Sequence, residues 1–328
     1  MEYPNELKLR YLLEQLHLYS QLQHEYGALG VEALWTKAEQ ALQAVLKEVK
    51  ALPVDAALSE QEPNDLPSIR QLRPKGPRRL WNRIDSAVYR EKLEGALFGR
   101  IAGNILGAPV EGCSPGFMEN LARENGDPFP PTDYWKYVPQ PFELHNEYSP
   151  REAYTRTKMD GVPVDDDLVY TLLGLFIIEE YGPDFSTEDV GRAWLKYLPF
   201  AYSAEETALK NLKAGIPAME AGARDNPFTE WIGADIRADP WGYLAPGYPE
   251  LAAEMAYRDA CLSHRRQGIY GAMLFAAAIA AAFQVQDPLE AIHVGLTEIP
   301  ADCRLAQHVR WALAEAPRIK SYVQAREA

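Results

Sequence analysis

The chain has 328 residues, of which 47% are hydrophobic and 24% are charged, and its formal net charge at pH 7 is -14. This length allows one large domain or two smaller ones with a sizeable buried core. The acidic balance argues against a surface for nucleic acid or anionic lipid, because both need clustered Lys and Arg.

Two amphipathic helical patterns open the chain, at about residues 5–26 and 31–52, with Gly27 to Gly30 as the break between them. Heptads in this pair extend over only two or three repeats. Residues 53–79 are rich in Pro, Asp, Glu, Ser and Lys and read as a flexible linker. The predicted organisation is an accessory helical segment, a linker and a main domain, at 1–52, 53–80 and 81–328.

The rest of the chain has helical periodicity and little strand-like alternation, which predicts an all-α fold. Long polar connections at about 114–163 and 223–250 interrupt it. Connections longer than about 15 residues are usually functional or disordered. The longest uncharged stretch, 268–286, is only marginally long enough to span a bilayer, so we predict a central helix of a globular bundle and no membrane span.

The cysteines and the N-terminus indicate the compartment. Three cysteines have a spacing that fits neither a zinc site nor a disulfide framework: Cys113, Cys261 and Cys303. The first residues have mixed charge and no continuous apolar segment typical of a secretory signal. We therefore predict a cytoplasmic protein in a reducing environment.

A glycine-rich helix is predicted over residues 94–112, where glycines recur every four residues at 95, 99, 103 and 107. Each glycine costs about 1 kcal/mol relative to Ala in a helix interior. Close approach of another helix would explain the pattern. Pro109 ends this helix and Glu111 follows, so its carboxylate can reach a metal or a ligand hydroxyl, unless it is simply an exposed turn residue.

Three consecutive carboxylates, Asp165, Asp166 and Asp167, precede an almost continuously apolar helix that ends near Tyr181. No Lys or Arg lies between Gly161 and Glu179, so nearby positive charge must come from elsewhere. A divalent ion such as Mg²⁺ is one source, since it prefers oxygen ligands. The alternative is helix capping with a solvated turn, although capping needs one Asp rather than three.

Three segments resemble the ADP-ribosylglycohydrolase family, which includes the dinitrogenase-reductase-activating glycohydrolases. They are the glycine helix at 95–112, the Asp165–Asp167 run leading into YTLLGL, and Ser263-His264 followed by GIYGAMLFAAAIAAAF. The likeness covers about residues 90–315. It implies an orthogonal all-α bundle with two divalent ions, Mg²⁺ or Mn²⁺, that hydrolyses the bond between ADP-ribose and a protein side chain or small acceptor.

By this resemblance, Glu111 stands where the family has a carboxylate after its glycine helix. Asp166 and Asp167 stand where it has the acidic pair of a Thr-Asp-Asp-Thr motif. Asp165 replaces the first Thr and can serve as an oxygen ligand, whereas Leu168 replaces the second and cannot. The resemblance thus implies metal binding by the three aspartates. Glu111 would orient or deprotonate the attacking water, or bind a metal.

The substrate side of the site is also implied by the resemblance. His264 matches a histidine that lines the ADP-ribose cleft of the family. Gly268, Tyr270 and Gly271 follow it at a helix start, where backbone N–H groups suit a pyrophosphate. Asn104 stands where many members have Asp. The implied partner is ADP-ribose or an ADP-ribosylated substrate.

The second acidic motif of the family, Gly-Asp-Thr-Asp-Thr, has no counterpart: no Asp after residue 200 has another Asp two residues away. The expected explanations are a fragment of a longer protein, a degenerate member, or a site completed by another chain. The abrupt end of the likeness favours the first. Two rivals to an enzyme remain: an ADP-ribose-binding module without catalysis, and a partner-binding protein whose helical pair drives oligomerisation.

Overall fold

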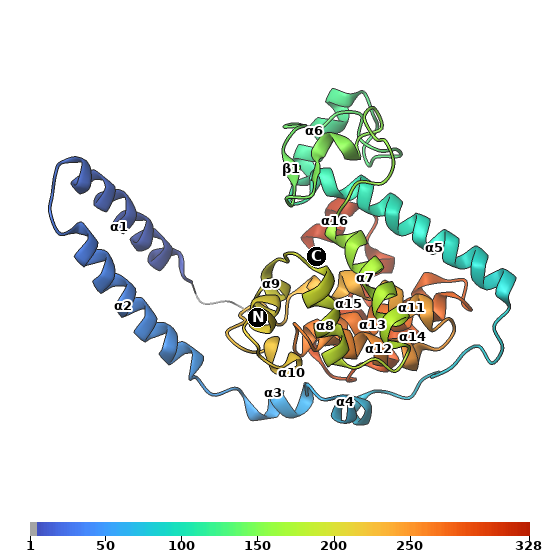
Figure 1. Ribbon diagram of the computed structural model, residues 1–328. Coiled ribbons are helices and arrows are strands. Elements are labelled where there is room, and N and C mark those ends of the chain that lie inside the picture. Colours follow the sequence, from blue (N-terminus) through green and yellow to red (C-terminus); the bar gives the residue numbers. More distant parts are fainter. Residues whose placement is uncertain (1–4) are drawn as a thin grey trace. The chain divides into compact units, whose positions relative to one another are not determined.

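The computed structural model describes residues 5–328, and its regular secondary structure is almost entirely helical (Figure 1). Over the described residues, 64% of the chain is helical, which confirms the predicted all-α fold. The only ladder there is the short antiparallel pair β1 (Leu144–His145) and β2 (Ser149–Pro150). The chain divides into two compact units, Met1–Leu58 and Ser59–Ala328.

The first unit is a helical hairpin of α1 (Leu7–Glu25) and α2 (Val31–Lys50). The turn between them uses Gly27 and Gly30, both with positive φ, which glycine adopts without steric cost. No described side chain in residues 5–58 is buried. Helix α3 (Ala56–Gln61) begins in the first unit and ends in the second.

The second unit is built around α13 (Gln267–Ala282), the predicted apolar helix. Twelve of its 16 residues are buried, and α11 (Asp239–Leu244), α12 (Pro249–Ala260) and α14 (Pro288–Gly295) pack against it (Figure 1). Small side chains allow this close packing. A Cβ on Gly242 of α11 would lie 2.5 Å from Ile279 Cγ2 of α13.

Shorter helices complete the bundle. Arg237 is fully buried and pairs with Glu205 at 2.8 Å and with Asp259 at 2.9 Å, so one cation joins three elements. The remaining helices of this part are α7 (Asp166–Tyr181), α8 (Thr187–Tyr197), α9 (Ser203–Lys213), α10 (Ala218–Ala221), η3 (Ile232–Arg237), η4 (Leu296–Glu298), α15 (Arg304–Glu315), η5 (Ala316–Arg318) and α16 (Tyr322–Glu327). No described helix is both long and apolar enough to cross a bilayer.

The predicted linker differs from the structure over its later part. Residues 59–80 form an ordered strap on the bundle, with α4 (Leu66–Leu72) in its middle. Ile69 is fully buried, and the buried Glu62 accepts hydrogen bonds from Arg266 and from the backbone N–H of Arg304. The strap is rich in polar residues because it is held on the bundle by ion pairs and hydrogen bonds. Its composition alone suggested a linker exposed to solvent.

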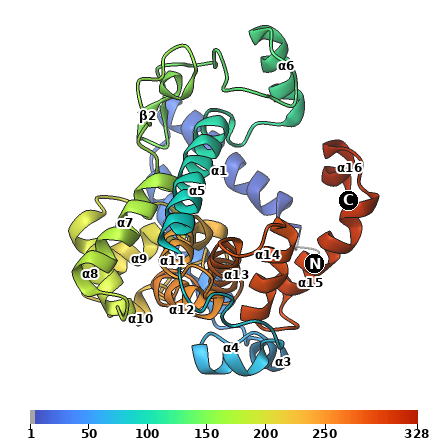
Figure 2. The same ribbon diagram turned by 90° about the vertical axis from the view of Figure 1, so that its right-hand side faces the viewer.

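Helix α5 (Ser86–Gly107) carries the glycine stripe and leads through η1 (Ala108–Val110) into a small lobe. The lobe contains α6 (Pro115–Asn125), the β1–β2 ladder and η2 (Arg151–Tyr154), and it lies at the C-terminal end of α5 (Figures 1 and 2). The predicted connection at 114–163 is therefore folded. A small core around Trp135 and Leu121 holds it together.

The glycine stripe has no helix packed on it within the described part of the chain. A Cβ built on Gly95, Gly99, Gly103 or Gly107 would meet no atom within 4 Å. The expected close approach of a second helix is therefore not found there. Instead, the missing side chains leave open space along α5.

Candidate active site

A cavity of about 680 Å³ lies where the end of α5, the start of α7, the β1–β2 hairpin and η3 meet. This volume is within the range of about 300–1,000 Å³ typical of small-molecule sites. Glu111, Asp165, Asp166 and Asp167 all line it. Residues far apart in sequence are thus brought together as one acidic wall, with Gly103 and Gly107 of α5 leaving the space open.

Asp165 caps helix α7 and is almost fully buried. Its side chain accepts a hydrogen bond from the backbone N–H of Asp167 at 3.3 Å. The Tyr154 hydroxyl donates to Asp165 Oδ2 at 2.8 Å. Burial first, and then the hydrogen bond to Asp165, raise the pKa of Tyr154, so this hydroxyl stays protonated. Capping therefore explains the first carboxylate of the run.

Capping does not explain the second and third carboxylates. Burial, followed by the neighbouring Asp165 and Asp167, raises the pKa of Asp166 to about 7. Asp167 Oδ2 accepts a hydrogen bond from Asn104 Nδ2 at 3.0 Å. Arg100 donates to the backbone carbonyl of Asp167 rather than to its carboxylate. Within residues 5–328, none of the three carboxylates pairs with Lys or Arg.

His145 and Asn146 complete the acidic wall from the β1–β2 hairpin. His145 Nε2 lies 3.5 Å from Glu111 Oε2 and 3.5 Å from Asp165 Oδ2, and its side chain is 6% exposed. Asn146 Nδ2 donates to Glu111 Oε2 at 3.3 Å. The Glu111 side chain is 66% exposed, so these two contacts aim a carboxylate that is otherwise free to move. Neither residue was predicted from the sequence, although both lie in the long polar connection at 114–163.

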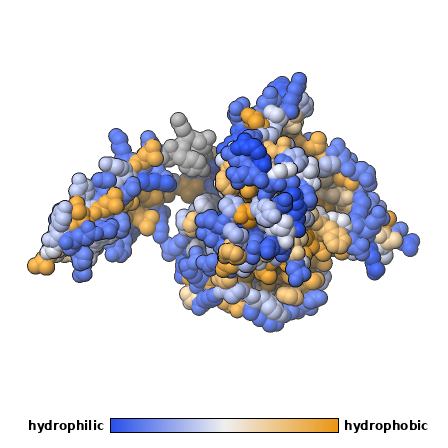
Figure 3. All heavy atoms as spheres, turned by 90° about the horizontal axis from the view of Figure 1, so that it is seen from above, coloured by the Kyte–Doolittle hydropathy of each residue, from blue (hydrophilic) through white to orange (hydrophobic). Residues whose placement is uncertain are grey.

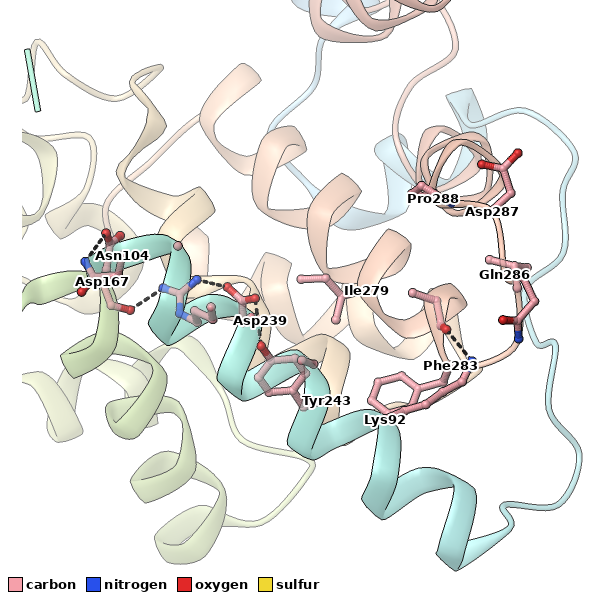
Figure 4. Close-up of a pocket in the computed structure, with 16 residues that line it drawn as sticks. Lys92, Asn104, Asp167, Asp239, Tyr243, Ile279, Phe283, Gln286, Asp287 and Pro288 are labelled. Carbon is pink, nitrogen blue, oxygen red and sulfur yellow. Dashed lines mark hydrogen bonds and ion pairs between the residues drawn. The ribbon is translucent and has the colours of Figure 1, made fainter. Parts of the chain in front are cut away.

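A second cavity, of about 630 Å³, lies on the other side of Asn104 and Asp167 (Figure 4). Here Arg100 pairs with Asp239, and the Tyr243 hydroxyl donates to Asp239 Oδ1 at 3.2 Å (Figure 4). The two cavities share Gly103, Asn104 and Asp167. The two cavities therefore adjoin one another along the glycine stripe of α5, and together they are called the groove below.

The residues predicted to bind pyrophosphate do not line either cavity. His264, Gly268, Tyr270 and Gly271 are buried. A Cβ on Gly268 would lie 2.6 Å from the His264 ring, and the Tyr270 hydroxyl donates to the carbonyl of Pro63 at 2.5 Å. The start of α13 is therefore packed against neighbouring chain rather than open to a ligand.

His264 is part of the buried polar core. Its Nδ1 lies 2.8 Å from Ser263 Oγ. Burial, followed by the charges of Arg237 and Arg265, holds the pKa of His264 well below its usual range. A neutral His264 thus packs beside the buried Arg237.

The acidic wall offers carboxylate oxygens, which are suitable ligands for a divalent cation. Carboxylate oxygens suit Mg²⁺, which is usually bound through one or two carboxylates while keeping several waters. Burial, followed by the neighbouring carboxylates, raises the pKa of Asp166, and a cation bound beside it would favour its ionised form. No group of three or more His, Cys, Asp or Glu arranged to hold a metal ion is found among the described residues. A site there would rely on waters or ligand oxygens for its other positions.

The fold and the cavities define an all-α protein with an acidic groove that is large enough for a small organic ligand. A sequence profile for the family described as ADP-ribosylglycohydrolase matches residues 85–328. The chain belongs to the ADP-ribosylglycohydrolase family, which points to hydrolysis of ADP-ribosyl bonds. No match was found among curated proteins or among solved structures.

Proposed function

We propose that this chain hydrolyses the glycosidic bond between ADP-ribose and an acceptor, with a divalent metal ion bound at the acidic wall. The observation that carries the proposal is the convergence of Glu111 with Asp165, Asp166 and Asp167 on one cavity. Glycoside hydrolysis commonly uses carboxyl groups that face one cavity, one to protonate the leaving-group oxygen and one to activate the attacking water.

Each side chain has a role that follows from its surroundings. Glu111 is exposed to the cavity and oriented by His145 and Asn146, so it is suited to align or deprotonate the attacking water. Asp165 holds the start of α7 in place through its cap and its bond from Tyr154. Asp166 and Asp167 offer the carboxylate oxygens for Mg²⁺ or Mn²⁺.

Bound there, the metal would supply positive charge next to the ribose hydroxyls and the bond being cleaved. Asn104 keeps the side chain of Asp167 turned toward the cavity by donating to its Oδ2. Because Asn104 is neutral, it adds a hydrogen-bond donor to the acidic wall, where an Asp would add a fifth carboxylate. The groove along α5 offers room for the rest of ADP-ribose.

The experiment incubates the chain with peptides that carry ADP-ribose on Arg or on Ser and measures free ADP-ribose by chromatography. Release in Mg²⁺ that stops in excess EDTA is the expected result. Glu111→Gln should lower the rate about 100–10,000-fold, the usual contribution of a general base. Glu119→Gln, a substitution on α6 away from the cavity, is the matched control and should leave the rate unchanged.

The second candidate is an ADP-ribose-binding module without catalysis. It is favoured by the lack of a three-residue metal-ligand group among the described residues. A thermal melt with ADP-ribose, in Mg²⁺ and in EDTA, separates the candidates when combined with the release assay. Stabilisation by ADP-ribose without release selects the module, because a ligand that binds only the folded state raises its stability.

A further inference from the structure

The N-terminal hairpin lies outside the matched family region and has an apolar surface that nothing in its own unit covers. Along α2, apolar residues recur at alternating steps of three and four residues, at Trp35, Ala38, Leu42, Val45 and Val49. This is the spacing of a helix that packs lengthwise against others. Leu42 is 41% exposed and Val45 57% exposed. Apolar side chains are visible along the hairpin in Figure 3, at the left.

Helix α1 adds a matching stripe, and the two helices enclose a shallow groove. Leu9, Leu12, Leu16 and Tyr19 follow the same spacing along α1. The groove between the helices has a volume of about 520 Å³. Six of the residues that line it are apolar: Leu13, Leu16, Trp35, Ala38, Leu42 and Leu46. Two helices of this length with no buried residue are only marginally stable in water, so a further surface must cover the groove.

The charges of the hairpin indicate what covers it. Helices α1 and α2 carry equal numbers of acidic and basic residues, five of each, although the whole chain has a net charge of -14. The half near the open end has a net charge of +2, from Lys8, Arg10, Lys47 and Lys50 against Glu14 and Glu48. The half near the turn has a net charge of -2, from Glu25, Glu32 and Glu39 against Lys37.

We propose that two copies of this chain associate through their hairpins, antiparallel to one another, to form a four-helix bundle. In this arrangement, the turn end of each hairpin lies beside the open end of the other, so halves of opposite charge meet. A parallel arrangement would set like charges together. Neutral charge over the two helices also favours self-association, whereas the acidic remainder of the chain is self-repelling.

The available area is sufficient for a stable dimer. Helices of 19 and 20 residues are about 30 Å long and about 10 Å wide. A two-helix face therefore measures roughly 600 Å² in projection. Its accessible area exceeds this projection because side chains form ridges, so it is of the order of the roughly 800 Å² per partner of a standard interface. Apolar residues at heptad spacing from both helices would fill the bundle core.

The first test measures the mass of the full chain in solution by light scattering at 1–50 µM protein. The chain should have twice its 36.8 kDa monomer mass. Leu42→Glu with Leu46→Glu should weaken the dimer by about 100-fold or more, because charge would be buried in the core. Gln40→Glu with Ala44→Glu places the same charge on the opposite face of α2 and should leave the dimer intact. A monomeric unsubstituted chain, or equal effects of both pairs, would overturn the proposal.

The second test distinguishes the orientation. Lys47→Glu with Lys50→Glu should weaken an antiparallel dimer by about tenfold, because acidic ends would then meet. Adding Glu25→Lys with Glu32→Lys should restore it. A parallel dimer would keep its affinity in both steps, because halves of like charge meet before and after each pair of substitutions. Circular dichroism of each variant checks that the main helical domain stays folded. An affinity that the first pair leaves unchanged refutes the antiparallel arrangement.

Discussion

Replacing Asp235 by Asn should stabilise the folded chain at neutral and alkaline pH. Asp235 lies in η3, next to the backbone of Gly271 in α13. Its Oδ1 is buried without a hydrogen-bond partner. Burial is the main reason that the pKa of Asp235 rises to about 7, while Arg237 lowers it and Glu205 raises it. The ionised form is therefore poorly tolerated in the folded state.

The direction of the pH effect follows from the two pKa values of Asp235. In the unfolded chain the pKa is near the ordinary 3.8, and in the folded chain it is about 7. Between these values the folded state holds a proton that the unfolded state has lost, so the free energy of unfolding falls as pH rises from about 4 to about 7. A shift of about three units corresponds to about 4 kcal/mol at most, and we expect about 2–4 kcal/mol.

The assay is urea denaturation, followed by tryptophan fluorescence, at pH 4, 5, 6, 7 and 8. Asp235→Asn should match the unsubstituted chain near pH 4 and become progressively more stable up to pH 8. Asp160→Asn removes an exposed carboxylate and should leave the pH profile of stability unchanged. If Asp235→Asn shows the same difference at every pH, or none at pH 8, the reasoning from burial is refuted.

Three further predictions concern the strap, the bundle and the acidic wall. Ile69→Ala should lower the free energy of unfolding by about 2–5 kcal/mol in urea denaturation, since it empties a fully buried site under the strap; no loss would mean that the strap is detached in solution. Gly222→Ala should cost about 1–3 kcal/mol, since its Cβ would lie 2.6 Å from the Leu262 carbonyl, and an unchanged urea midpoint would contradict that packing. His145→Ala should slow ADP-ribose release about 10–100-fold, measured at a temperature where the variant is fully folded, because Glu111 loses its orienting contact. His293→Ala, an exposed histidine elsewhere, is the control, and equal rates for both variants would remove His145 from the site.

Helices with a strong sequence pattern were predictable, and the strap was not. The continuous apolar run that begins after Gln267 indicated α13 because only a buried helix accepts so much Ala without charge. The strap at 59–80 lacks such a pattern. Its fixed position depends on long-range partners, such as Glu62 with Arg266, that are more than 200 residues apart. The composition of a segment indicates how well water solvates it, but it does not reveal which distant residues pair with it.

The acidic half of the candidate site was predictable, because Glu111 and the aspartate run lie in motifs with distinctive local sequence. His145 was not, because a lone histidine in a polar connection has no periodic or motif signal. Its place beside Asp165 depends on the fold of the β1–β2 hairpin. The start of α13 shows the converse: its glycines suggested an open anion site, but they permit close packing against His264 and Asp235.

The most direct test compares ADP-ribose release by the chain and by Asp166→Asn in a titration with Mg²⁺, with ADP-ribose binding measured on the same preparations. We expect release by the unsubstituted chain to rise with Mg²⁺ and that by Asp166→Asn to stay at least about 100-fold lower. Release that is independent of Mg²⁺ and unaffected by the substitution would contradict catalysis at the acidic wall.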